Sequence, residues 1–318
     1  MVLYALRAND IQSRGVFAPF SRETFLLINN VLLLVSAAAI LVATLYPLFM
    51  DALDLGKISV GPPYFNQVFV PLALPLLLLA GIGPLLAWRQ AEFKQLRPVA
   101  RRLIIPTLLL AAVTPVLMGR WSLPVFIAMM MIVWTILTMI YLLIQKFSQD
   151  KQYIFSTGFF AMLLAHIGLG VFAIGATLTS AYSVEKEIAV TPGERVQLSG
   201  YEFELLRSEE GIGPNYQAFR GVIRVYDNDG EVLGELYPER RTYTAQANNP
   251  MTEAAIHKNV FRDLYVALGE PRERDIRQRL RLYYRPFIRW IWVGALLMTI
   301  AGFLAAYAHR RKEHVEAA

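Results

Sequence analysis

Residues 25–49 have the sequence FLLINNVLLLVSAAAILVATLYPLF, which contains no charged side chain. An α-helix needs about 20 predominantly apolar residues to cross the hydrocarbon core of a bilayer, and this stretch meets that requirement. Five further apolar stretches predict spanning helices at residues 68–87, 103–118, 123–144, 154–178 and 287–308. The expected fold class is therefore membrane α-helical, a polytopic bundle of about six transmembrane helices.

The composition agrees with this prediction. Of the 318 residues 55% are hydrophobic and only 18% are charged, and the mean hydropathy is +0.40. An average soluble protein has about a quarter charged residues, so an ordinary soluble globule and a disordered chain are both excluded. The chain has no cysteine, which excludes thiol catalysis and thiolate metal sites.

One long polar segment, residues 180–285, separates the fifth span from the sixth. Its alternating runs predict strands at residues 195–198, 201–206, 218–226, 232–237 and 277–284. Asp227-Asn228-Asp229-Gly230 predicts a hairpin turn, because these residues tolerate positive φ. Thr252–Leu268 is predicted as a helix that stops at Gly269-Glu270-Pro271. The sequence thus divides into a five-helix membrane domain (1–179), an inserted, mainly antiparallel β domain (180–285), and a sixth helix with its tail (286–318).

Lysine and arginine residues are distributed unevenly between the loops. Thirteen lie in the N-terminal segment, the second-to-third loop, the fourth-to-fifth loop and the C-terminal tail, whereas the short loops on the other side carry only Lys57 and Arg120. The positive-inside rule therefore predicts that both termini are cytoplasmic. The protein would then lie in a bacterial inner membrane, with residues 180–285 in the periplasm. Membrane lipid is an expected partner. The net charge of +6 is explained by topology and not by a nucleic-acid site.

His166 lies at the midpoint of the predicted fifth span. A polar ring at this depth is costly and marks a functional site by default, and neutral imidazole is a common ligand of haem iron. A stripe of small residues on the same helix would let another helix or a flat macrocycle approach closely; it comprises Gly158, Ala161, Ala165, Gly168 and Gly175. Two interpretations stay open: a ligand or proton-relay role, and a histidine hydrogen-bonded to a neighbouring helix. The other three histidines lie outside the mid-membrane region, so a second axial imidazole would have to come from another segment or chain.

Four arginines near the end of the polar segment form a second candidate site: Arg277, Arg279, Arg281 and Arg285. Arg277, Arg279 and Arg281 alternate with apolar residues, which predicts a cationic strand face. The planar guanidinium fork suits carboxylates, including haem propionates. The alternative is a solvated strand face next to an interfacial belt of tryptophan and tyrosine.

Several motifs, spread over nearly the whole chain, resemble the C-terminal half of the CcmF family of bacterial cytochrome c haem lyases. They are Phe20-Ser21-Arg22-Glu23-Thr24, Gly61-Pro62-Pro63-Tyr64-Phe65-Asn66, Leu164-Ala165-His166-Ile167-Gly168, Thr179-Ser180-Ala181-Tyr182-Ser183, Gly213-Pro214-Asn215-Tyr216, Thr252-Glu253-Ala254-Ala255-Ile256, Arg262-Asp263-Leu264-Tyr265 and Tyr283-Tyr284-Arg285-Pro286-Phe287. The related lyase for assembly of formate-dependent nitrite reductase fits the same motifs.

The resemblance implies assistance in the covalent attachment of haem to the CxxCH motif of apocytochrome c in the periplasm. It also implies two haems, a substrate haem and a b-type haem in the membrane, with His166 as one axial ligand of the latter. The implied partners are the haem chaperone CcmE, apocytochrome c with its thiol-handling chaperone subunits, and an N-terminal half of the lyase. The tryptophan-rich periplasmic motif of that half is absent here, so we expect a fragment or a split subunit that does not catalyse ligation alone.

Two other function classes compete with this one. A haem or small-molecule transporter would use proline-broken spans, such as the one that contains Pro71, Pro75 and Pro84. The sequence shows no inverted repeat and only one ionisable residue in mid-span, which argues against it. A non-catalytic docking scaffold of the maturation complex would use only the β domain.

Overall fold

The computed structural model describes residues 19–88, 92, 94, 96–149, 156–246, 249–270 and 277–316. Contacts divide the chain into two compact units. The first comprises residues 1–167 and 304–318, and the second comprises residues 168–303. Two helices, α7 and α8, run from one unit into the other, so each contributes to both.

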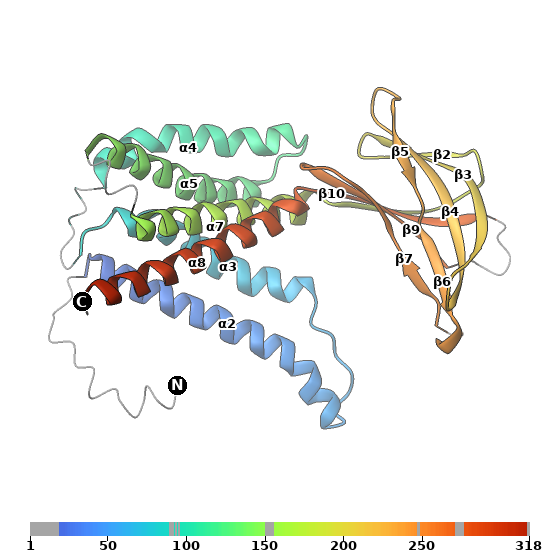
Figure 1. The fold of residues 1–318 in the computed structure, drawn as a ribbon, viewed down its shortest axis with the longest axis horizontal. Helices are drawn as coiled ribbons and strands as arrows, with labels where there is room; N and C mark the ends of the chain where they lie inside the picture. The colour runs from blue at the N-terminus through green and yellow to red at the C-terminus, as the bar shows by residue number, and fades with distance from the viewer. Residues whose placement is uncertain are drawn as a thin grey trace. The chain divides into compact units, whose positions relative to one another are not determined.

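Six helices in the described residues are long and apolar enough to cross a membrane, which confirms the predicted fold class. They are α2 (Arg22–Ala52), α3 (Pro62–Ile82), α4 (Arg97–Leu117), α5 (Leu123–Gln149), α7 (Thr157–Tyr182) and α8 (Ile288–Glu316), as labelled in Figure 1. The short 3₁₀ turn η2 (Gly83–Leu85) follows α3 and contains Pro84. The first two residues of the predicted span 154–178 lie outside the described part of the chain.

The helix ends differ from the predicted ones because polar and proline residues form the first turns. Helix α2 begins three residues before the apolar run, where the Oγ of Ser21 accepts a hydrogen bond from the Thr24 amide at 3.2 Å. Helix α3 begins with Pro62 and Pro63, at positions where a missing N–H costs nothing. It continues unbroken through its two internal prolines.

Helices α3 and α5 of the first unit are in close contact. A Cβ on Gly81 would lie 2.5 Å from Cδ1 of Trp134, so only glycine leaves room for the indole ring. One turn away, the hydroxyl of Thr135 donates a hydrogen bond to the carbonyl of Leu77 at 2.8 Å. Small residues and interhelical hydrogen bonds are the usual means by which helices associate in a membrane.

The second unit contains an antiparallel β-sandwich. Its strands are β1 (Val184–Val190), β2 (Arg195–Leu198), β3 (Tyr201–Ile212), β4 (Tyr216–Tyr226), β5 (Val232–Leu236), β6 (Glu239–Tyr243), β7 (Met251–Glu253), β8 (Ala255–Lys258), β9 (Arg262–Leu268) and β10 (Gln278–Pro286). The first sheet has the order β1-β10-β9-β8. The second has the order β2-β3-β4-β6-β7, and β5 pairs with β4. This mainly antiparallel β domain agrees with the prediction.

Alternate residues of both sheets point inward and form one apolar core. The first sheet contributes Leu264, Val266, Leu280 and Leu282, all fully buried. The second contributes Phe203, Leu205, Ile223 and Val225, also fully buried. The period of two along these strands is the pattern expected for a sandwich that buries one face of each sheet.

The helix predicted for Thr252–Leu268 is wrong. This segment forms β7, β8 and β9, with a hairpin turn after Lys258. Leu264, Val266 and Leu268 are buried on one face of β9, which is a strand period. Weak helix propensities in the first half of the segment lose against this packing. The Asp227–Gly230 turn is confirmed, since the Asp227 carboxylate accepts bonds from the amides of Asp229 and Glu231.

The sandwich is joined to its two helices almost without linkers. Ser183 alone separates α7 from β1, and Phe287 alone separates β10 from α8. Phe287 has a φ of 55°, a left-handed conformation that bends the chain sharply from strand into helix. The hydroxyl of Thr179 on α7 donates a hydrogen bond to the carbonyl of Pro286 at 2.6 Å. The ends of α7 and β10 are therefore fixed to each other.

Candidate functional site

His166 lies on α7, nine residues after Thr157, which places it about 14 Å along the helix axis. Its ring nitrogen Nδ1 is 2.8 Å from the carbonyl oxygen of Met162, one turn earlier. A carbonyl can only accept, so Nδ1 carries the proton and Nε2 carries the lone pair. Within the part of the chain that the structure describes, Nε2 has no hydrogen-bond partner. The sequence left open a hydrogen bond from His166 to a neighbouring helix. In the structure the hydrogen bond is made within α7 instead.

This arrangement fits an axial ligand of haem iron. Iron-binding histidines commonly donate one ring N–H to a carbonyl, which fixes the tautomer and the ring orientation and leaves the other nitrogen for the metal. Among the described residues no group of three or more His, Asp or Glu side chains could hold a metal ion. In the described part of the chain His166 therefore offers a single imidazole and is not one member of a chelating cluster.

The small residues around His166 have separate roles. A Cβ on Gly168 would lie 3.0 Å from the Gly294 carbonyl oxygen, and a Cβ on Gly175 would lie 2.6 Å from the Ile291 amide nitrogen. Both glycines therefore allow α8 to approach α7. Around Gly158 there is open space. The C-terminal members of the predicted stripe thus serve helix packing.

Two of the four candidate arginines are paired within the first sheet. Arg279 and Arg281 on β10 lie 3.2 and 3.5 Å from the carboxylate of Glu187 on the edge strand β1. Arg285 lies over the ring of Tyr283, 5.3 Å from its centroid. Arg277 immediately precedes β10 and is exposed. The structure thus places three of the four on one strand and partly neutralises the predicted cationic face.

A polar cluster around the buried Arg262, which the sequence did not single out, lies beside the sandwich core. Arg262 is 7% exposed; its Nη1 lies 2.6 Å from Nδ1 of His257, and its guanidinium carbon lies 4.5 Å from the Tyr201 ring centroid. Because the guanidinium can only donate, His257 accepts and is neutral. The Tyr201 ring in turn stacks on Tyr284. No carboxylate lies within ion-pair distance of Arg262 among the described residues.

This cluster predicts that the protein loses stability on acidification. Burial, and then the charge of Arg262, lower the pKa of His257 below its usual 6.5. The unfolded chain therefore binds a proton that the folded chain rejects, so stability falls as the pH drops below about 6.5. His257→Asn keeps an acceptor for Arg262 but cannot titrate. Thermal unfolding of both chains between pH 7.5 and 5.5 should show a smaller loss for the variant, and equal losses would contradict the assignment.

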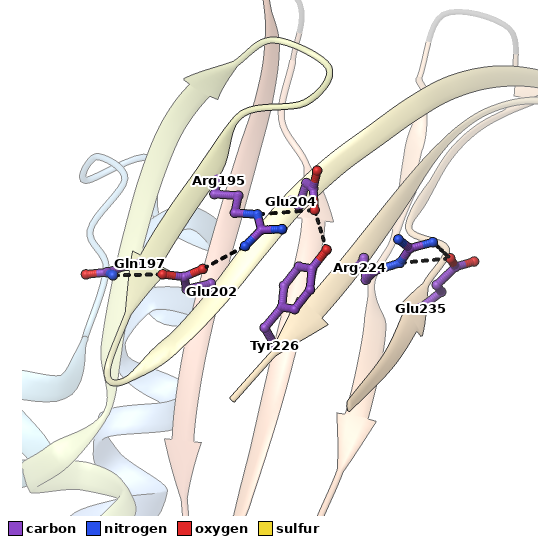
Figure 2. Close-up of polar contacts among 7 residues, drawn as sticks. All are labelled: Arg195, Gln197, Glu202, Glu204, Arg224, Tyr226 and Glu235. Carbon is purple, nitrogen blue, oxygen red and sulfur yellow. Dashed lines mark hydrogen bonds and ion pairs between the residues drawn. The ribbon is translucent and has the colours of Figure 1, made fainter. Parts of the chain in front are cut away.

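The outward face of the second sheet carries a row of alternating charges (Figure 2). The register places Arg195, Glu204, Arg224 and Glu235 opposite one another on four neighbouring strands. Arg195 lies 3.3 Å from Glu204, and Arg224 lies 2.8 Å from Glu235. The hydroxyl of Tyr226 donates a hydrogen bond to Glu204. Since each of these charges faces an opposite one, the row stabilises the sheet surface and offers no free charge for a ligand.

The comparisons with known proteins agree on one family. Residues 181–286 match the family model described as the CcmF C-terminal β-sandwich. The chain is 39% identical over 321 residues to the cytochrome c-type biogenesis protein CcmF of Pseudomonas aeruginosa, covering 99% of this chain and 48% of that protein. It is 36% identical to CcmF of Escherichia coli, covering 99% and 48%, and 30% identical to NrfE of Haemophilus influenzae, covering 98% and 48%.

A solved structure described as the cytochrome c haem lyase CcmF superposes with a TM-score of 0.74. It covers 91% of this chain and 46% of that one. At 23% identity the superposition shows a common fold. The chain spans about half the length of the curated relatives it matches.

Proposed function

We propose that this chain, which matches the C-terminal half of CcmF-type proteins, works in cytochrome c biogenesis as one part of a haem lyase. The observation that carries the proposal is the combination of a family-matched β-sandwich with six apolar helices, one of which presents a tautomer-fixed histidine. The rest of the lyase would be supplied by an N-terminal half. That half would bring the residues for covalent attachment of haem to apocytochrome c.

His166 would be an axial ligand of a b-type haem in the membrane. Its Nε2 lone pair is available, and the Met162 carbonyl holds the ring in place through Nδ1. Bound at this position, haem iron supplies one-electron redox chemistry. The second axial ligand would come from the N-terminal half, because the other histidines of this chain, His257, His309 and His314, lie outside the mid-membrane region.

The remaining assignments follow from charge and position. Both termini would be cytoplasmic and residues 180–285 periplasmic, since basic residues gather in the loops on one side. The β domain would then dock CcmE, apocytochrome c and its thiol-handling subunits. Arg277 and Arg285 are candidates for contacts with haem propionates or partners. Arg279 and Arg281 would contribute less, because Glu187 already balances them.

Replacing His166 tests the ligand assignment. The chain would be co-expressed with the N-terminal half, and the complex examined by absorption spectroscopy and by the pyridine haemochromogen assay. His166→Ala should remove most of the b-type haem per complex, whereas His309→Ala, at an exposed histidine near the end of α8, should leave it unchanged.

A folding defect is separated from ligand loss by a second variant. His166→Gly leaves space for free imidazole, which should restore the haem spectrum if the missing group is an iron ligand. Full haem content in His166→Ala, with the two halves still co-purifying, would overturn the ligand assignment. Loss of haem without imidazole rescue would point to a packing role.

A further inference from the structure

The turn between β8 and β9 carries two exposed apolar side chains. Val260 is 63% exposed and Phe261 is 58% exposed. The turn is well defined, since the Asn259 side chain accepts a hydrogen bond from the Phe261 amide at 3.1 Å and the Asn259 amide donates to the Arg262 carbonyl at 2.9 Å. We call residues 259–261 the apolar tip.

The apolar tip is bonded directly to the first turn of α8. The indole N–H of Trp290 donates to the Val260 carbonyl at 3.1 Å, and the Phe287 amide donates to the Phe261 carbonyl at 2.8 Å. The ring of Phe261 contacts those of Phe287 and Trp290, with centroids 5.9 and 6.5 Å apart. These contacts hold the tip at the same height as the start of α8.

The start of α8 carries the residues expected at the edge of a membrane. Helix α8 is a spanning helix from Ile288, and its first turns carry Trp290 and Trp292, the latter 75% exposed. Tryptophans gather at the boundary between acyl chains and headgroups. Because one helical turn rises only about 5 Å, the apolar tip lies within that boundary zone.

The other hairpin tips of the sandwich are of two kinds. The β3–β4 hairpin ends at Ile212, which is 91% exposed, whereas two further tips are polar. The β4–β5 turn consists of Asp227, Asn228, Asp229 and Gly230, and the β2–β3 turn consists of Ser199 and Gly200. The apolar tip is distinguished by its bonds to the first turn of α8. Valine and phenylalanine side chains at this position gain free energy in the interfacial zone of a bilayer.

We infer that Val260 and Phe261 insert into the outer interfacial zone of the lipid bilayer beside α8. The apolar tip then gives the β domain a membrane contact of its own, in addition to its covalent links to α7 and α8. The recognised chemistry is the apolar glycerol and upper acyl region of phospholipids. This inference needs only that α8 crosses the membrane and is independent of the haem proposal.

The chain has no cysteine, so a fluorophore that reacts with thiols would attach only at a single introduced cysteine. Val260→Cys is the main probe, since the contact recorded for Val260 uses its backbone carbonyl. Asp229→Cys at the β4–β5 tip is the matched control. Each chain would be labelled with a fluorophore in phospholipid nanodiscs and exposed either to lipids with nitroxides near the headgroup or to a water-soluble quencher.

The label at V260C should be quenched by the lipid nitroxides roughly threefold more than the label at D229C, and by the aqueous quencher less. Equal responses at the two sites would overturn the inference and place the tip in water. Protection of V260C from both quenchers would also overturn it, because the tip would then be covered by protein. Unchanged thermal unfolding of V260C shows that the labelled chain is folded.

Discussion

Gly294→Ala should destabilise the chain by at least about 3 kcal/mol, because the new methyl group would collide with backbone. A Cβ at this position would lie 2.6 Å from both the Gly168 carbonyl oxygen and the Cα of Phe172, and it would also contact the Phe172 amide nitrogen. Backbone atoms in a helix cannot rotate away as a flexible side chain can. The variant can accommodate the methyl group only if α7 and α8 separate.

Gly302→Ala is the matched control, in the same helix and with the same atoms added. Around Gly302 there is open space, so alanine meets nothing and should even gain slightly from its better helix propensity. Thermal unfolding in detergent or nanodiscs measures both variants. A midpoint for Gly294→Ala close to that of Gly302→Ala would mean that the two helices are not in contact there.

Glu239→Ala should cost about 2 kcal/mol, because it leaves Arg220 without its counter-charge and Arg241 with only the Glu253 carboxylate, 3.7 Å away. The Glu239 carboxylate is 6% exposed and accepts hydrogen bonds from Arg220 at 2.6 Å and from Arg241 at 2.8 Å. Burial raises its pKa, but the bonds from Arg241 and Arg220 outweigh burial and keep the pKa below the usual 4.5. Both arginines reach solvent, which keeps the loss below that of a fully buried pair.

Glu235→Ala on the same sheet is the control for this prediction. Its pairing with Arg224 is exposed to water, where an ion pair contributes little. Denaturant unfolding of the two variants should therefore show a clear loss for Glu239→Ala and a small one for Glu235→Ala. Equal midpoints would mean that burial does not strengthen the Glu239 pairing. The loss should shrink as the pH falls below the usual carboxyl pKa of 4.5, because the pKa of Glu239 is lowered in the folded chain, and a loss that stays constant there would contradict the electrostatic cause.

The sequence was sufficient for the spanning helices because their signal is long and strong. A run of about twenty apolar residues, such as the one after Phe25, forms an α-helix in a membrane because the helix satisfies its own backbone hydrogen bonds. The helix ends were less predictable, since Pro62 and Ser21 form first turns outside the apolar runs. Strand β2 was predicted with its correct ends, but β1 and β6 were missed, because the charged residues of their exposed faces hide the alternation.

The segment 252–268 shows why the prediction of short elements from sequence fails. Its alanines and glutamate favour a helix by a few tenths of a kcal/mol each, whereas the burial of Leu264, Val266 and Leu268 in the sandwich contributes more. No glycine or proline marks the turn at Asn259–Phe261. The information that decides this segment lies in its partner strand β10, about 20 residues further along the chain.

The candidate site was predictable in part. The cost of a polar ring in a spanning helix singles out His166 as a candidate, and its role as a ligand stays a prediction. The bond from its Nδ1 to Met162, and the pairing of Arg279 and Arg281 with Glu187, depend on side-chain geometry and strand register, which no local pattern contains. The same holds for Arg262 and His257, which come together only when β8 pairs with β9.

The single-residue joints at Ser183 and Phe287 restrict how the β domain can move relative to the adjoining ends of α7 and α8. A domain on a flexible tether samples a large volume, and the effective concentration at any one point in that volume is low. Here the β domain has little freedom to move, because a hydrogen bond between Thr179 and Pro286 joins α7 to the end of β10. A molecule bound to it would be held in one orientation relative to the adjoining ends of α7 and α8. A binding molecule then associates more slowly than it would with a flexibly tethered domain, but once bound it is already oriented relative to α7 and α8.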